Sequence, residues 1–344
     1  NISLPLFPVY DRNNDENRYQ AIIKEVNPEY SIITFEGQFP PESGLYYAQI
    51  QGVSIHPVKV SIEGVDSEKT EAVSRELSSI PNFAEIIAVE KKAMYTILVL
   101  DGRYHIVAGN DPDKKDLVQS IGTGEPGALS TLTSYVKHIS RWNFIKQLYN
   151  PHTQIFRDAE IGFPFFPFEI SIIKYFSDGS TEERILESRQ IEMELNEMIT
   201  ERGRTFPIAN LSIRVKNIHP ARKFYVAGVY LSMNFLADAG LFPEKGQFLE
   251  PQEKIDTPKL RLAHAPYLDA NGWDESREII KLVFCEEAFT SEMFELPPLP
   301  YPEIKGAKNI PQADQYRDIP GKKTPPKADW ATLFFEIISR RPYT

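Results

Sequence analysis

The strongest helical pattern in the chain lies in residues 128–149, ALSTLTSYVKHISRWNFIKQLY. Its apolar side chains recur three or four positions apart, which places them on one face of a helix. They are Leu129, Leu132, Val136, Ile139, Trp142, Ile145 and Leu148. Pro126-Gly127 precedes the segment and Asn150-Pro151 follows it, as is typical where a helix begins and ends. The pattern predicts a long amphipathic helix, and we place the principal domain boundary there.

Short apolar segments separated by polar turns precede this helix. Residues 30–35 and 94–100 are typical of strands, and Asp101-Gly102 supplies the positive φ angles of a two-residue hairpin turn. Residues 67–79 predict a helix, because apolar residues recur at helical spacing behind the capping candidates Asp66 and Ser67. We expect a small β-rich region here, whose helix accompanies a small antiparallel sheet.

Strand patterns return after the long helix. Residues 208–215, 223–231 and 278–284 are rich in β-branched and aromatic residues, and turn signals separate them at the intervals of a β-sandwich. Nine of the 27 prolines fall in the last 48 residues, so residues 297–328 predict an irregular Pro-rich crossing before a last strand at 331–338.

The predicted fold class is α+β, mainly β, in three parts. They are an N-terminal β-rich α+β region at 1–125, a connecting amphipathic helix at 126–151 and a C-terminal antiparallel β-sandwich-like domain at 152–344.

The composition argues against several classes of binding partner and of location. With 38 Lys and Arg against 48 Asp and Glu, the net charge of −10 argues against binding to nucleic acid or to an acidic membrane surface. No apolar run is long enough to span a membrane, and the first residues lack the pattern of a signal peptide. The single Cys285 excludes an intrachain disulfide. We therefore expect a cytoplasmic protein.

The motifs that could carry chemistry are incomplete. Cys285 follows a strand-like apolar run and precedes Glu286-Glu287, whose charges raise the pKa of a thiol, so a buried structural cysteine is favoured. The histidines show no zinc-ligand spacing; they are His56, His105, His138, His152, His219 and His264. The sequence therefore predicts no catalytic residue and no metal ligand.

Two further patterns resemble ligand loops. Gly122–Gly127 spells G-x-G-x-x-G before a helix, but charged residues precede it and Glu125 would face a pyrophosphate. Asp111, Asp113 and Asp116 are spaced as in a calcium loop, but lysines intervene and the required glycine is missing. We interpret the first as a turn that begins the helix and the second as a charged turn, and we expect no cofactor.

Residues 163–168, FPFFPF, are unusually aromatic. If they are exposed, Phe163, Phe165, Phe166 and Phe168 are the candidate interaction residues, although a buried strand between domains is the favoured interpretation. Two alternatives stay open. Carboxylate pairs such as Glu192 with Glu194, or Glu286 with Glu287, could serve a glycoside hydrolase with a dispersed site. Coplanar exposed aromatics on one sheet face would instead indicate a sandwich that binds carbohydrate or another ligand.

Several segments occur in an order found in a known family. They are Val136–Trp142, Leu148–Pro151, Leu211–Val215 with Asn217, Phe224–Leu231, Glu278–Val283 with Phe289, Leu296–Leu299 and Asp329–Thr332. Over about residues 95–344 the chain resembles the non-catalytic C-terminal region of bacterial caspase-like proteases of the metacaspase and orthocaspase type. No residue here matches the catalytic His and Cys of that family, which belong to another domain.

The resemblance implies an accessory module that regulates the protease, recruits its substrates or holds a partner through protein contacts. The expected partner is a caspase-like catalytic domain or a protein substrate. The resemblance would also explain why the chain begins at Asn1, as a piece released by cleavage or cut from a longer protein.

Overall fold

The computed structural model describes side chains in residues 57–89, 92–109, 111–150, 153, 155–156, 166–195, 197–200, 207–263, 268, 272–289, 291–302 and 329–340. It describes the backbone alone for residues 201 and 204–206 and for strands within the first 48 residues. The chain divides into two units, Asn1–Pro57 and Val58–Thr344. The expected boundaries near 125 and 151 do not coincide with this division, and buried side chains between Ala128 and Ile145 belong to a core of the second unit.

The first unit contains one antiparallel four-stranded sheet in the order β3-β2-β1-β4. Its strands are β1 (Phe7–Asp11), β2 (Asn14–Val26), β3 (Ser31–Glu36) and β4 (Tyr46–Ala48). Strand β3 overlaps the strand that the sequence predicts at 30–35.

The second unit begins with a five-stranded sheet in the order β6-β5-β7-β8-β9, which we call the mixed sheet. Its elements are β5 (Val58–Gly64), α1 (Ser67–Ser78), β6 (Ala84–Ile86), β7 (Tyr95–Leu100), β8 (Arg103–Ala108), β9 (Ile121–Gly122) and α2 (Ala128–Gln147). The expectation of an antiparallel sheet was wrong for β5, which runs parallel to both β6 and β7. Helix α1 carries the chain back along the sheet, so the next strand starts from the same end.

Local sequence signals set the ends of these elements. The side chain of Asp66 caps α1 by accepting a hydrogen bond from the backbone N–H of Lys69 at 3.1 Å. Asp101 and Gly102 have φ angles of 49° and 72°, as a two-residue hairpin turn between β7 and β8 requires. Both predictions are confirmed.

The rest of the second unit is a sandwich of two six-stranded sheets. The inner sheet, with order β12-β21-β20-β15-β16, also contains β17; the outer sheet, with order β11-β10-β14-β13, also contains β18 and β19. The elements are β10 (Phe168–Tyr175), β11 (Thr181–Ile185), β12 (Gln190–Glu194), β13 (Glu197–Glu201), β14 (Arg204–Asn217), β15 (Phe224–Leu231), β16 (Ala237–Asp238), η1 (Pro243–Lys245), β17 (Gln247–Leu249), β18 (Lys254–Asp256), β19 (Leu260–Ala263), β20 (Glu275–Cys285), η2 (Ser291–Phe294) and β21 (Trp330–Arg340).

The strand pairs of the sandwich are antiparallel except for β12 with β21, which is parallel and departs from the expected all-antiparallel pattern. Alternate side chains on β20 point to opposite faces of the inner sheet. Ile280, Leu282 and Phe284 belong to the core between the two sheets, whereas Ile279 and Val283 belong to a second core on the other face. The inner sheet is therefore covered on both faces.

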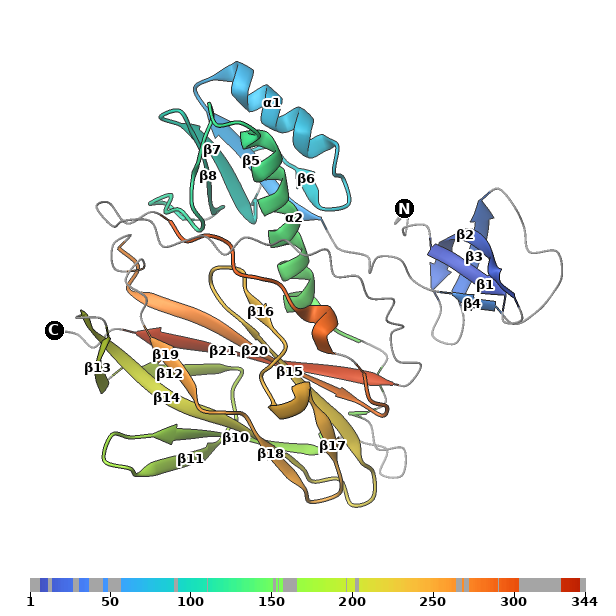
Figure 1. The fold of residues 1–344 in the computed structure, drawn as a ribbon, viewed down its shortest axis with the longest axis vertical. Coiled ribbons are helices and arrows are strands. Elements are labelled where there is room, and N and C mark those ends of the chain that lie inside the picture. Colours follow the sequence, from blue (N-terminus) through green and yellow to red (C-terminus); the bar gives the residue numbers. More distant parts are fainter. Residues whose placement is uncertain are drawn as a thin grey trace. The chain divides into compact units, whose positions relative to one another are not determined.

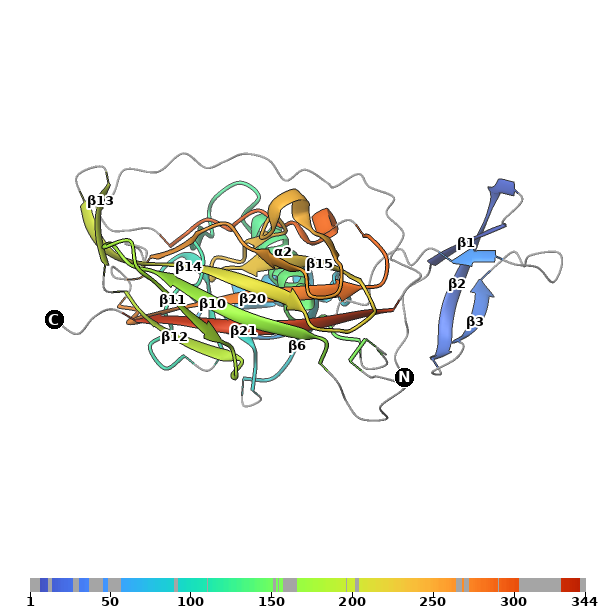
Figure 2. The same cartoon turned by 90° about the horizontal axis from the view of Figure 1, so that it is seen from below.

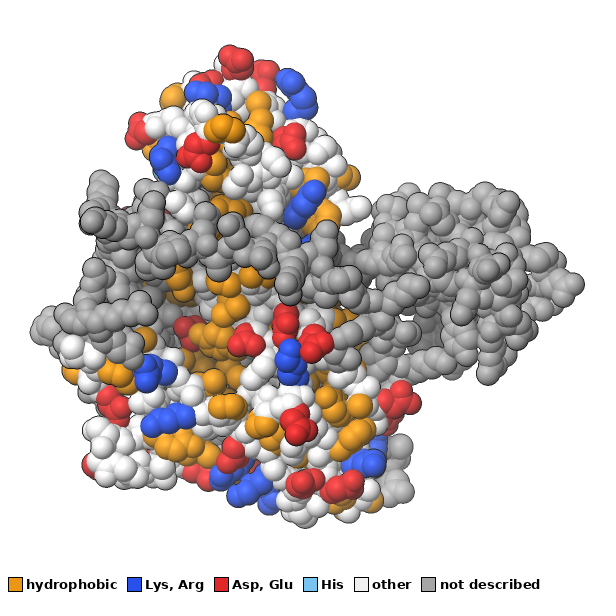
Figure 3. Space-filling view, in the orientation of Figure 1, with side chains coloured by type: hydrophobic (Ala, Val, Ile, Leu, Met, Phe, Trp, Pro, Cys, Tyr) orange, Lys and Arg blue, Asp and Glu red, His pale blue; other side chains and the backbone are white. Residues whose placement is uncertain are grey.

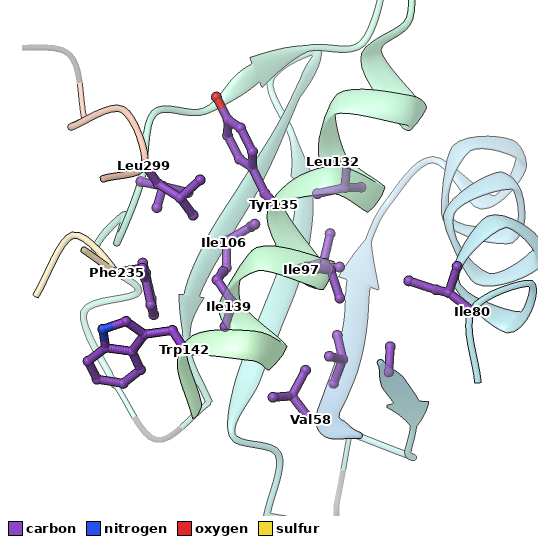
Figure 4. Close-up of a cluster of buried hydrophobic side chains, with 14 of the residues drawn as sticks. Val58, Ile80, Ile97, Ile106, Leu132, Tyr135, Ile139, Trp142, Phe235 and Leu299 are labelled. Atoms are coloured by element: carbon purple, nitrogen blue, oxygen red, sulfur yellow. The ribbon is translucent and has the colours of Figure 1, made fainter. Parts of the chain in front are cut away.

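Helix α2 supplies the cover on that second face. In Figure 1 it runs from the mixed sheet toward the inner sheet of the sandwich, and Figure 2 gives the view from below. Figure 4 shows Leu132 and Ile139 of α2 packed among Ile97 and Ile106 of the mixed sheet, and Trp142 beside Phe235. The α+β, mainly β class is confirmed, and its long helix joins two layers of one core instead of linking two separate domains.

Candidate contact surface

The aromatic run at 163–168 divides between buried and exposed positions. Phe163 and Phe165 lie outside the described residues. Phe168, the first residue of β10, is 3% exposed, which agrees with the favoured interpretation of a buried strand. Phe166, two residues earlier, is 38% exposed. Of the described members of this run, Phe166 is thus the one that can meet a partner.

Beneath Phe166 lies a cluster of rings that we call the aromatic end: Phe156, Phe166, Phe168, Phe224 and Phe284. Phe168 stacks on Phe284 with ring centroids 4.0 Å apart and meets the edge of Phe224 at 5.2 Å. Phe168 begins β10, Phe224 begins β15, and Phe284 is the second-last residue of β20. Antiparallel pairing brings these strand ends to the same end of the sandwich.

The ring of Phe166 is held from several sides. Its centroid lies 5.2 Å from that of Phe156, 5.8 Å from that of Phe168 and 6.4 Å from that of Phe284. The pairs with Phe168 and Phe284 are edge-to-face, and the pair with Phe156 is tilted. Such aromatic pairs each stabilise by about 0.5–1.5 kcal/mol beyond the area that they bury. Phe166 therefore presents apolar surface while its orientation is already fixed.

Asp329 fixes the segment that carries Phe156. Its Oδ2 accepts hydrogen bonds from Thr153 Oγ1 and from the backbone N–H of Ile155, both at 3.0 Å. Asn150, just after α2, donates from Nδ2 to Asp329 Oδ1 at 3.2 Å and to the carbonyl of Trp330 at 2.8 Å. Hydrogen bonds thus connect Asn150, which follows α2, and Thr153 and Ile155 to the start of β21, beside the aromatic end.

A charged rim flanks the cluster. The guanidinium of Arg222 lies 4.9 Å from the ring centroid of Phe224 and pairs with Glu286. His219 Nδ1 accepts hydrogen bonds from the backbone N–H groups of Ala221 and Arg222 at 3.1 and 2.9 Å, which fixes the turn before β15. Figure 3 shows acidic and basic side chains interspersed on the face that it draws.

Cys285, next to Phe284, is fully buried, and burial raises the pKa of its thiol. The interpretation as a structural cysteine is confirmed, because a nucleophilic cysteine needs access and a lowered pKa.

The two loop motifs are local structure, as predicted. Glu125 Oε1 accepts the backbone N–H of Gly122 at 2.8 Å, so the glycine-rich turn is closed by its own carboxylate. Asp111 accepts the backbone N–H groups of Asp113 and Lys115 at 3.0 and 2.8 Å, which makes a charged turn. Over the part of the chain that the structure describes, no three His, Cys, Asp or Glu residues converge as metal ligands.

Among the described residues, two of the carboxylates considered for a hydrolase and one aromatic ring of the outer sheet already have charged partners. Glu192 is exposed and lies 3.5 Å from Arg340, while Glu286 pairs with Arg222 at the other end of β20. On the outer sheet, Tyr175 has the ammonium of Lys259 over its ring at 4.9 Å. An aromatic ring covered by a cation is not the open platform that a sugar requires.

A histidine–aspartate pair occurs on the mixed sheet, where sequence spacing gave no warning of it. His105 Nδ1 lies 3.0 Å from both carboxylate oxygens of Asp116. This hydrogen bond raises the pKa of His105. The other ring nitrogen, Nε2, is buried and has no hydrogen-bond partner, so it is not presented to a substrate. The pair stabilises the loop that returns from β8 to β9.

Asp116→Asn tests this pair through its pH dependence. Because the pKa of His105 is raised in the folded state, the pair stabilises fully below the ordinary histidine pKa of about 6.5, and its contribution is lost as pH rises through the folded value. We expect a larger loss of thermal stability in the variant at about pH 6 than at about pH 9. Thermal unfolding at both pH values measures it, and an equal loss at both would contradict a charged histidine.

Two buried ionisable residues on β20 were missed as functional candidates. Lys281 is 2% exposed, and burial lowers its pKa to about 7; burial raises the pKa of Glu278, whose Oε2 has no hydrogen-bond partner. The signal in the sequence was a lysine inside the apolar run 279–284, which is unusual because burying a charge is costly.

No protein-family profile matches the chain, and no curated protein matches it significantly. Among the helices that the structure describes, none combines the length and apolar character needed to cross a membrane.

Proposed function

We propose that the chain is a non-catalytic accessory module of a bacterial caspase-like protease, and that it binds the catalytic domain or a protein substrate through the aromatic end. The observation that supports this most is Phe166, which is 38% exposed and yet held by three neighbouring rings. A large apolar group that is already ordered loses little conformational entropy on binding, and aromatic residues of this kind dominate the energy of protein interfaces.

The placement of the resembling segments also supports the proposal. Asn150 belongs to the segment 148–151, and its side chain bonds to Asp329 and to the backbone of Trp330 in the segment 329–332. Phe224 begins the segment 224–231 and packs against Phe168 in the aromatic end. Segments that lie far apart in the sequence, and that carry the resemblance, thus meet beside the proposed contact surface.

Phe166→Ala is expected to weaken binding at least about tenfold to the purified catalytic domain of a bacterial caspase-like protease, because it removes an interface anchor. The matched control is Phe334→Ala, which removes a ring of equal size that is 37% exposed on β21, where the Arg189 guanidinium lies 5.4 Å from its centroid. Isothermal titration calorimetry with the full chain measures both affinities.

The control should bind within about twofold of the unaltered chain, since surface positions outside an interface contribute little. Equal weakening by both variants would place the contact elsewhere than the aromatic end. If the unaltered chain binds neither the catalytic domain nor its protein substrates, the proposed function is rejected.

A further inference from the structure

Helix α2 meets β20 of the inner sheet and the loop between β15 and β16 through basic side chains that are bonded to backbone carbonyls. His138 Nε2 on α2 lies 2.9 Å from the carbonyl oxygen of Phe235, and Lys281 Nζ on β20 donates to the carbonyl of Lys146 at 2.8 Å. His138 is 4% exposed and Lys281 is 2% exposed. Neutral bonds hold the same contact: Trp142 Nε1 donates to the carbonyl of Leu236 at 3.0 Å. We call this contact between α2 and the inner sheet the joint.

The other charged groups around the joint are mostly basic. On α2, the charge of Arg141 repels a proton on His138, and the ammonium of Lys146 lies 5.5 Å from the ring centroid of Trp142. On the inner sheet, Glu336 attracts and Arg277 repels the charge of Lys146, and the two side chains lie 3.6 Å apart. On the mixed sheet, burial raises the pKa of the Tyr95 phenol to about 12, so this group is neutral below about pH 10. Burial lowers the pKa of Lys146 as well, and Arg277 also pairs with Glu275 at 2.6 Å. Burial and the nearby cations thus both oppose the addition of a proton at the joint.

We propose that the joint is an acid-sensitive device, in which uptake of protons by His138 and Lys281 favours the separation of α2 from the inner sheet. This goes beyond the proposed function and does not depend on it, because it concerns the contact between two layers of one core. Opening of the joint would release the last turn of α2 from β20. That turn is followed in the chain by Asn150, whose side chain bonds to Asp329 beside the aromatic end.

The two groups act in different pH ranges. Burial lowers the pKa of Lys281 from its ordinary 10.5 to about 7, so an opened joint binds one more proton than a closed joint between these values. Burial also lowers the pKa of His138 below its ordinary 6.5, so the same imbalance appears for His138 below about pH 6.5. In both ranges opening becomes easier as pH falls, by up to about tenfold per pH unit for each group.

Hydrogen exchange of the whole chain, measured by mass spectrometry and corrected for intrinsic rates, tests the device without any variant. The amides of residues 138–147 report opening of the joint, and those of α1 are the internal reference. We expect the opening constant of residues 138–147 to rise about 50-fold from about pH 9 to about pH 7, and to rise again below about pH 6.5, relative to α1. Equal changes in α1 and α2 would overturn the proposal.

Two variants assign the ranges. Lys281→Met should remove the rise between about pH 9 and pH 7 and leave the rise below about pH 6.5. His138→Gln should remove the rise below about pH 6.5 and leave the rise between about pH 9 and pH 7. Glutamine keeps a side-chain donor for the carbonyl of Phe235. If either folded variant keeps the unaltered profile in the range assigned to it, that residue is not part of the device. Retention of both rises in the double variant would overturn the proposal entirely.

Discussion

Lys281→Met is expected to stabilise the protein at neutral pH by about 3 kcal/mol. The lysine is 2% exposed and its pKa falls to about 7, so the folded state must release a proton or bury a charge that the unfolded state carries freely. The full linkage cost of this shift is on the order of 4–5 kcal/mol at neutral pH, and the loss of the hydrogen bond to the carbonyl of Lys146 offsets part of the gain. Methionine keeps the length of the side chain and removes the charge.

The gain should depend on pH in one direction. It is fully present below about pH 7 and shrinks as pH rises toward about 10.5, where lysine is neutral in both states. Urea unfolding of both proteins at several pH values measures it. Lys223→Met, at an exposed lysine just before β15, is the matched control and should change stability by less than about 0.5 kcal/mol at any pH. A stability difference that does not vary between about pH 7 and pH 10 would show that Lys281 stays charged when folded.

Phe284→Ala is expected to destabilise the protein by about 3–5 kcal/mol, because the ring is fully buried and its neighbours cannot collapse into the space that it leaves. Phe168 stacks on it at 4.0 Å and Phe166 contacts its edge at 6.4 Å, so the variant removes the support of the aromatic end as well as core volume. Chemical unfolding gives the loss in stability, and near-ultraviolet circular dichroism reports the order of the remaining rings.

Phe166→Ala is the matched comparison within the same ring cluster. Its ring is 38% exposed but makes three ring contacts, so we expect a loss of stability of about 1–2 kcal/mol, smaller than that of Phe284→Ala, while binding falls strongly. The two variants therefore separate the rings that stabilise the fold from the ring that meets a partner. If Phe284→Ala cost less than about 1 kcal/mol, the aromatic end would not be a packed support for Phe166.

Most elements of the fold could be predicted from local patterns. The long helix α2, the helix α1 with its Asp66 cap, and the hairpin at Asp101-Gly102 follow from periodicity, capping and turn chemistry within short segments. The pairing of the strands in the sheets could not be predicted from such local patterns. The parallel pairs of β5 with its neighbours, and of β12 with β21, depend on segments that are far apart in the sequence, which no local pattern specifies.

The candidate surface was predicted only in part. The run 163–168 drew attention to aromatic residues, but Phe156, Phe224 and Phe284 complete the cluster from other elements. Burial also could not be assigned residue by residue, since Phe166 and Phe168 lie two positions apart and differ from 38% to 3% in exposure. The first lies before β10 and the second within it, where sheet pairing encloses the ring.

Patterns along the chain are enough to locate both helices, many of the strands and the mainly β class, and to predict that Cys285 is buried, because these depend on neighbours in the sequence. The tertiary structure places α2 between two layers of one core and brings Lys281 and His138 to backbone carbonyls. It also decided that Phe166 stands on a packed ring cluster. These features arise from contacts between distant segments, where burial and the low local dielectric set the energy of each group.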